Sequence, residues 1–146
     1  MSNEISPDPE NILEQLRQGR ILVVGRRRNG LILFKRRHAE FAGPGAIVGG
    51  IFDDVEDVLP IGNLMLTVPE DSEQRQHAYK TRRQWILQTR QITSQPDPEE
   101  RAREIIERFE MWFSAEITER IPDDAFALLI GVLPSTVSQV RQSRHL

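Results

Sequence analysis

The sequence predicts an α+β fold, with a small N-terminal antiparallel β-sheet unit and flanking helices followed by a C-terminal three-helix unit. Between residues 21 and 68, short runs of aliphatic residues alternate with glycine-rich segments, which is typical of strands and turns. After residue 96 the apolar residues recur every three or four positions, which is typical of amphipathic helices. The change at "SQPDPEE" predicts a β-rich domain over residues 1–94, for dimerisation or sensing, and a helical domain over residues 95–146.

Length and composition place the chain among cytoplasmic proteins. Its 146 residues, 38% of them hydrophobic, are enough for one modest core or two small ones. No run approaches the roughly 20 apolar residues that a membrane-spanning helix needs. The N-terminus "MSNEISPDPE" is acidic and contains prolines, unlike a secretory signal. We therefore expect a cytoplasmic protein that does not contact a membrane.

The residues that carry enzymatic or metal chemistry are scarce. Without cysteine there is no thiolate nucleophile, disulfide or cysteine metal site. The three histidines, His38, His77 and His145, are far apart in the sequence. Because no nucleophile lies beside a base and the acids occur in charged runs, the sequence predicts a protein that is not an enzyme and has no cofactor or metal site.

Charged residues occur in blocks of alternating sign, although the net charge is only −3. Residues 20–37 hold six arginines and one lysine without an acid, and residues 53–73 hold seven acids without a base. Residues 75–90 hold five bases without an acid. Such blocks can form a basic stripe for a polyanion, or they can neutralise one another within the fold.

The N-terminal unit begins with a tail over residues 1–8 and a short helix over residues 9–19 that Gly19 ends. The apolar runs at residues 21–24 and 31–34 are predicted to pair as a hairpin. Its turn would be Asn29-Gly30, because this dipeptide tolerates positive φ at both turn positions.

The glycine-rich segment over residues 41–54 lacks the order of a phosphate-binding loop, so its glycines are expected in turns or at a strand bend. Residues 46–52 and 63–68 are predicted strands. The acidic stretch between them, residues 53–62, lacks the spacing of a calcium-binding loop and is expected to be a solvated loop.

Residues 72–92 are ambiguous, because the first part favours a helix and the second part, rich in β-formers, could be a last strand. We predict a helix followed by a strand. Trp85 is expected in the core, with stacking on a nucleic-acid base by Trp85 or Tyr79 as the alternative.

The helical domain opens with a strong start signal. Asp97 is a good N-cap, Pro98 suits the first helical position, and Glu100 completes a capping box. One helix is predicted over residues 99–119, with an inward face and an acidic outward face. The inward face comprises Ala102, Ile105, Ile106, Phe109, Trp112 and Phe113, and the outward face Glu99, Glu104, Glu107 and Glu110. Pro122-Asp123 begins a further helix.

The stretch "AFALLIGVLPSTVSQVRQ", residues 125–142, has the spacing of two short helices that cross closely. Ala127 is small enough for a close crossing, and Gly131 permits the positive φ that ends a helix abruptly. Val132, Val137 and Val140 follow at apolar positions. In order and spacing, this pattern resembles the helix-turn-helix of the lambda-repressor, lac-repressor and catabolite-activator groups of bacterial regulators.

The resemblance implies a DNA-binding transcriptional regulator that contacts double-stranded DNA as a homodimer, with half-sites about 34 Å apart. The side chains that would meet bases or phosphates are Ser135, Thr136, Ser138, Gln139, Arg141, Gln142 and Arg144. Auxiliary phosphate contacts are expected from Arg26, Arg27, Arg28, Arg82 and Arg83.

Two departures from the pattern keep an alternative function open. Leu133 stands where these regulators usually have a small polar cap, so either Ser135 caps the helix or Leu133 packs on another group. Residues 97–146 also carry ten acids against six arginines. The alternative is a non-catalytic protein–protein adaptor or assembly factor that keeps the fold without binding DNA and contacts its protein partner through Leu133 and Phe126.

Overall fold

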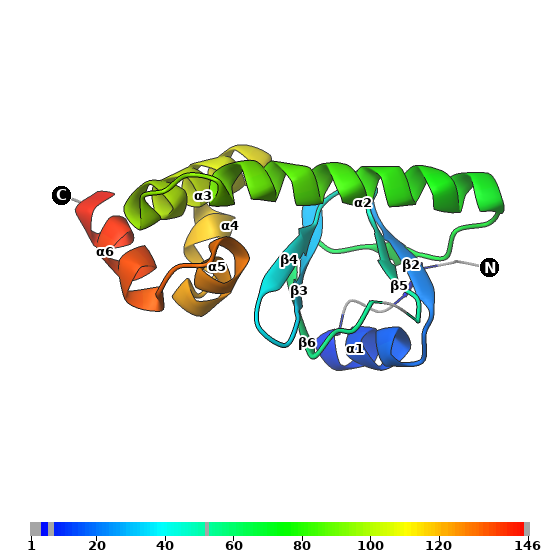
Figure 1. Ribbon diagram of the computed structural model, residues 1–146. Coiled ribbons are helices and arrows are strands. Elements are labelled where there is room, and N and C mark those ends of the chain that lie inside the picture. The colour runs from blue at the N-terminus through cyan, green and yellow to red at the C-terminus, as the bar shows by residue number, and fades with distance from the viewer. Residues whose placement is uncertain (1–3, 6–7, 52, 145–146) are drawn as a thin grey trace. The chain divides into compact units, whose positions relative to one another are not determined.

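The computed structural model describes residues 4–5, 8–51 and 53–144 and has the α+β fold that the sequence predicted (Figure 1). The chain divides into two compact units, Met1–Ile86 and Leu87–Leu146, called here the first and second units. All described strands belong to the first unit, and four helices between residues 98 and 144 belong to the second. No helix in the described part of the chain has both the length and the hydropathy needed to cross a bilayer.

The first unit contains two antiparallel sheets among its described residues. One has the strand order β1-β7-β2-β5 and comprises Glu4–Ile5, Leu66–Thr67, Ile21–Val24 and Ile47–Gly49. The other has the order β4-β3-β6 and comprises Ala39–Ala42, Asn29–Phe34 and Asp57–Gly62. The central strand β3 is almost wholly buried, because it has a partner along both edges and apolar residues on both faces.

Helix α1 (Pro9–Arg17), which the sequence predicted, completes the core of the first unit. It contacts β5 of one sheet and β6 of the other, and lies at the opposite end of the strands from the helix α2 (Ser72–Thr93) (Figure 1). Its buried Ile12 and Leu16 join aliphatic side chains from both sheets, including Leu22, Leu31 and Leu66. The two sheets and α1 therefore share one hydrophobic core.

The predicted hairpin at Asn29-Gly30 is wrong, because β2 and β3 belong to different sheets. Asn29 is buried and stabilises the connection: its side-chain amide donates to the carbonyls of Gly25 and Arg27, and its oxygen accepts from the Met65 N–H at 3.4 Å. Gly30 lies inside β3, where a Cβ would come within 2.6 Å of the Phe41 ring. Glycine is needed here for close packing, and not for a positive φ.

Three further predictions for the first unit need correction. The tail contains β1, which pairs with β7. The acidic stretch over residues 53–62 contains β6, which pairs with β3 along its whole length because buried β3 needs a second partner. The predicted strands over residues 46–52 and 63–68 shorten to β5 and β7, with Phe52 outside the described residues. Gly45, Gly49 and Gly50 have positive φ, with Gly45 in a turn, Gly49 at the end of β5 and Gly50 in the bend that follows, in agreement with the expected turns or strand bend.

Helix α2 (Ser72–Thr93) is one uninterrupted helix, so the strand predicted over its second half is wrong. The side chains of Ala78, Arg82 and Trp85 recur at helical spacing and are buried or partly buried. Trp85 packs edge-to-face on Phe41, with ring centroids 5.2 Å apart, and its indole N–H donates to the Pro44 carbonyl at 3.2 Å. These tertiary contacts favour a helix over the local β preference, and they place Trp85 in the core and not on an open stacking surface.

The second unit contains α3 (Pro98–Trp112), α4 (Ala115–Glu119), α5 (Asp123–Ile130) and α6 (Pro134–Arg144). The Asp97 carboxylate caps α3 as predicted, accepting the Glu99 N–H at 3.1 Å. The single helix predicted over residues 99–119 is instead broken at Phe113, and the Ser114 hydroxyl accepts the Ile117 N–H to start α4. The described unit therefore has four helices of its own, one more than the sequence predicted.

Three phenylalanine rings lie in the core of the second unit together with buried aliphatic side chains. Phe109 of α3 contacts Phe113 and packs edge-to-face on Phe126 of α5, with ring centroids 5.7 and 5.1 Å away. Of the six predicted inward residues, five are buried and Trp112 is half-buried against Phe109. Helix α3 packs against each of the other three helices, so it holds α5 and α6 in place.

Candidate nucleic-acid interface

The connection between α5 and α6 is a tight turn centred on Gly131. Gly131 has φ 69° and ψ 43°, the left-handed conformation expected from the sequence. Its N–H and that of Val132 both donate to the Ala127 carbonyl, at 2.9 and 3.1 Å. Because α6 begins at Pro134, three residues are enough to change the direction of the chain.

The residues at the apolar motif positions pack against the rest of the second unit. Ala127, Val137 and Val140 are buried, and Val132 is partly buried. Helix α6 contacts both α5 and α3. One side of α6 is therefore fixed by packing, which leaves its other side for solvent or a partner.

The solvent side of α6 carries uncharged polar residues. Ser135, Gln139 and Gln142 are exposed and lie at the i, i+4, i+7 spacing of one helical stripe, with Thr136 and Ser138 partly buried beside it. Hydrogen bonds from these five side chains to other described residues are absent. The stripe thus presents donors and acceptors that no described residue of the chain occupies.

Leu133 lies immediately before α6 and is 69% exposed, so it is not packed into the described part of the chain. A leucine side chain has no polar group with which to cap the helix. Its carbonyl accepts the Thr136 N–H at 3.0 Å. The exposed Pro134 follows as the first residue of the helix. An apolar pair therefore stands at the N-terminal end of α6.

Arg141, a predicted DNA contact, is engaged within the second unit. Its guanidinium donates to the Asp123 carboxylate at 2.7 Å and to the Thr118 carbonyl at 2.9 Å, and lies 5.0 Å from the centroid of the Phe126 ring. These three contacts join α6 to α4 and α5. The geometry therefore gives Arg141 a packing role.

Arg144, the other arginine of α6, is also paired. It forms ion pairs with Glu110 and, at 3.6 Å, with Glu107, both on α3. These glutamates were expected to face outward, away from other elements. Sequence reasoning missed the partners Asp123, Glu107 and Glu110, because long-range pairs leave no local pattern.

The predicted auxiliary phosphate contacts fall into two groups. Arg26, Arg27 and Arg28, in the connection from β2 to β3, are exposed, as is Arg83 on α2, and none has an ion pair with another described residue. Arg82 is buried instead, with only 10% of its side chain exposed, and cannot reach a phosphate. The prediction of Arg82 as a phosphate contact was wrong because the sequence of a basic segment does not distinguish a buried arginine from an exposed one.

Arg82 belongs to a cluster of four charged side chains in the first unit, called here the Arg82 cluster: Arg82, Lys35, Glu40 and Asp53. Arg82 donates to the Ile47 carbonyl at 2.9 Å, to Glu40 at 3.1 Å and to Asp53 at 3.3 Å. Lys35 pairs with Asp53 and, at 3.5 Å, with Glu40. Asp53 is therefore not part of a solvated acidic loop, and part of the basic and acidic blocks neutralise each other within the fold.

The ionisation of Asp53 reflects these partners. Burial by itself would raise the pKa of the Asp53 carboxyl. The charge of Arg82, a hydrogen bond from Lys35 and another from the Gly49 N–H outweigh burial and lower the pKa below its ordinary value of 3.8. Asp53 is therefore a carboxylate at neutral pH, and not a candidate general acid.

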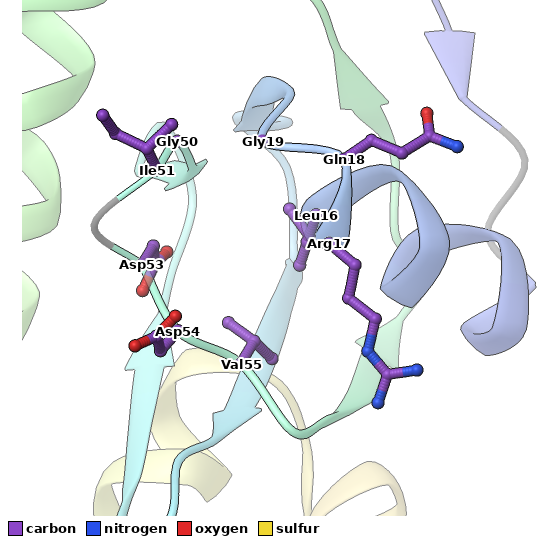
Figure 2. A pocket seen from close by; sticks show the side chains of 9 residues that line it. All are labelled: Leu16, Arg17, Gln18, Gly19, Gly50, Ile51, Asp53, Asp54 and Val55. Atoms are coloured by element: carbon purple, nitrogen blue, oxygen red, sulfur yellow. The ribbon is translucent and has the colours of Figure 1, made fainter.

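A pocket of about 300 Å³ lies between the end of α1 and the segment after β5 (Figure 2). Its lining residues are Leu16, Arg17, Gln18, Gly19, Gly50, Ile51, Asp53, Asp54 and Val55. Two of the charged side chains that line the pocket already have partners within the first unit. Asp53 belongs to the Arg82 cluster, and Arg17 donates to the Glu56 carbonyl at 3.3 Å. The Gln18 side chain points away from both aspartates in Figure 2, so the pocket offers few groups to orient a ligand.

A second pocket, of about 450 Å³, lies in the second unit. It is lined by Ile106, Glu110, Thr118, Glu119, Arg141 and Arg144. Both arginines already have carboxylate partners. Within the described ranges, no three histidine or acidic side chains come together as ligands for a metal ion.

No protein-family model matches this chain, and no match is found among curated proteins or among solved structures.

Proposed function

We propose that this protein binds duplex DNA through α6 and acts as a transcriptional regulator. The observation that carries this proposal is the stripe of unpaired polar side chains, Ser135, Gln139 and Gln142, on a helix whose opposite side is buried. A helix presented in this way fits the major groove, where hydroxyl and amide groups can bond to base edges. The tight turn at Gly131 sets the crossing of α5 and α6 that such presentation requires.

The charges of the second unit set the expected strength of binding. Its residues carry ten acids against seven arginines, and both arginines of α6 are paired. Since DNA affinity depends largely on neutralising phosphates, α6 alone would bind weakly. We expect the exposed arginines, Arg26 to Arg28 and Arg83, and a second copy of the chain to supply the missing phosphate contacts, which makes the active form a homodimer.

A titration of the full chain against a labelled random duplex tests the proposal. Affinity is expected to fall as salt rises from about 50 to 200 mM, because counterions compete for the phosphates. A preferred site is then selected from a random duplex library. Replacing both Ser135 and Gln139 with alanine should weaken binding to this site roughly tenfold and leave binding to random duplex nearly unchanged. The control is Gln91→Ala, an exposed amide on α2. If no binding appears at low salt, the proposal is wrong.

A protein–protein adaptor is the second candidate, and the exposure of Leu133 favours it. An exposed leucine before a helix with no unpaired arginine also suits an apolar cavity in a protein partner. A photocrosslinking residue at position 133 should then give one discrete protein adduct in cells, whereas one at exposed Met111 should not. Adducts of equal yield from both positions would contradict the adaptor function.

A further inference from the structure

We propose that α6 selects A·T base pairs, with Gln139 reading adenine and Leu133 and Pro134 contacting the C5-methyl group of thymine. The inference rests on the proposed DNA binding and specifies which bases the helix reads. It follows from three features of α6: the engagement of its arginines, the unpaired amide of Gln139, and the apolar pair Leu133-Pro134 at its N-terminal end.

The arginines of α6 would have to give up contacts within the second unit in order to read guanine. Guanine presents two acceptors, O6 and N7, in the major groove, and the side chains that match them are the guanidinium fork of arginine and the ammonium group of lysine. Arg141 is held by Asp123, the Thr118 carbonyl and the Phe126 ring. Arg144 is held by Glu107 and Glu110, and the described residues of α6 include no further cation.

Gln139 has the chemistry that adenine requires. Adenine presents one acceptor, N7, and one donor, the N6 amino group, and a glutamine amide can bond to both at once. The amide of Gln139 is exposed and has no hydrogen bond to a described residue. Ser135 lies one turn earlier on the same stripe, where its hydroxyl can donate or accept without favouring one base pair.

Leu133 and Pro134 match the only apolar group that the bases place in the major groove, the C5-methyl of thymine. Both are exposed, and both lie at the N-terminal end of α6, the end that approaches base edges in helix-turn-helix complexes. A polar cap at position 133 would have stabilised the helix start, whereas an exposed leucine leaves it without a side-chain cap. The leucine is therefore better explained by contact with an apolar group outside the chain.

The test begins with selection of binding sites from a random duplex library by the full chain. The selected half-sites are expected to be rich in A·T pairs. Each thymine of a selected site is then replaced by uracil, which removes only the C5-methyl group. At one position the replacement should weaken wild-type binding about fourfold, the effect expected for one buried methyl. The same uracil replacement should weaken binding by the Leu133→Ala variant less than it weakens wild-type binding, because only Pro134 is left to contact the methyl group. The Gln139→Ala variant should lose roughly tenfold of the preference for adenine at one position.

Matched controls keep these outcomes specific. Met111→Ala removes an exposed apolar side chain from α3, and Gln91→Ala removes an exposed amide from α2, so both should respond to uracil as the wild type does. Selected sites centred on guanine, or equal wild-type affinity for thymine and uracil at every position, would overturn the inference and leave DNA binding standing. Absence of DNA binding at low salt would overturn the proposed function as well.

Discussion

The two units use arginine in different settings. In the first unit, Arg82 is 10% exposed and joins two carboxylates and a lysine, which connects α2 to strands of both sheets. In the second unit, Arg141 is 21% exposed, has one carboxylate partner and lies over a phenyl ring. The first unit therefore holds a buried charged cluster beside its aliphatic core. The second unit has a core that includes three phenyl rings, a tight turn, and ion pairs that lie nearer the surface.

The largest effect is expected from Arg82→Ala. Removing the guanidinium leaves two carboxylates with a single lysine, so the first unit should lose about 3 to 5 kcal/mol of stability. Hydrogen exchange of the full chain, measured peptide by peptide, should show lost protection in β4 and β5. Arg83→Ala, at the exposed neighbour, is the control and should change stability by less than about 0.5 kcal/mol. Equal losses of stability in the two variants would show that the buried Arg82 cluster does not stabilise the first unit more than an exposed arginine does.

A smaller effect is expected from Gly131→Val in the second unit. A Cβ at position 131 would meet no atom within 4 Å apart from its neighbours in the chain, so the cost comes from the left-handed backbone and should be about 1 to 3 kcal/mol. Gly131→Asn is the matched variant, and it should cost less because asparagine tolerates this conformation. Thermal unfolding and exchange of α5 and α6 measure both. If asparagine is as harmful as valine, the turn is not limited by its φ angle.

Protonation of Asp53 at low pH should destabilise the Arg82 cluster less than removal of Arg82 does. The pKa of Asp53 is lower in the folded chain than its ordinary value of 3.8. The ionised carboxylate therefore contributes its full stabilisation above pH 3.8, and this stabilisation is lost as the pH falls through the pKa of the folded chain. Below pH 3.8 the first unit should therefore lose stability, and Asp53→Asn should flatten this acid limb. Denaturant unfolding at a series of pH values checks the slope. An unchanged slope in Asp53→Asn would assign the acid sensitivity to other carboxylates.

The smallest effect is expected from Arg120→Ala. Arg120 pairs with Glu116 at 2.9 Å, but both side chains are more than 70% exposed, so water screens the pair. The second unit should lose no more than about 0.5 kcal/mol, a change that chemical denaturation can bound. A loss comparable with that of Arg82→Ala would remove the contrast between buried and surface charge.

Local signals in the sequence predicted many elements of the fold. The N-cap at Asp97, the end of α1 before Gly19 and the left-handed turn at Gly131 all depend on residues close in the chain. The same reasoning failed at Asn29-Gly30, where a turn-forming dipeptide lies at the start of a buried strand. It failed again for the second half of α2, because contacts of Trp85 with Phe41 and Pro44 outweigh the local β preference.

For the candidate site, the spacing of Ala127, Gly131, Val137 and Val140 was enough to predict a tight turn and the buried side of α6. The sequence by itself determined the fold class, the turn and the polar stripe, because helical periodicity and glycine conformation are local properties. Only the tertiary structure decided which arginines remain unpaired, since Arg141 meets Asp123 and Arg144 meets Glu110 across long separations in the chain. The physical reason is that an ion pair depends on proximity in space, which folding creates and no local pattern records.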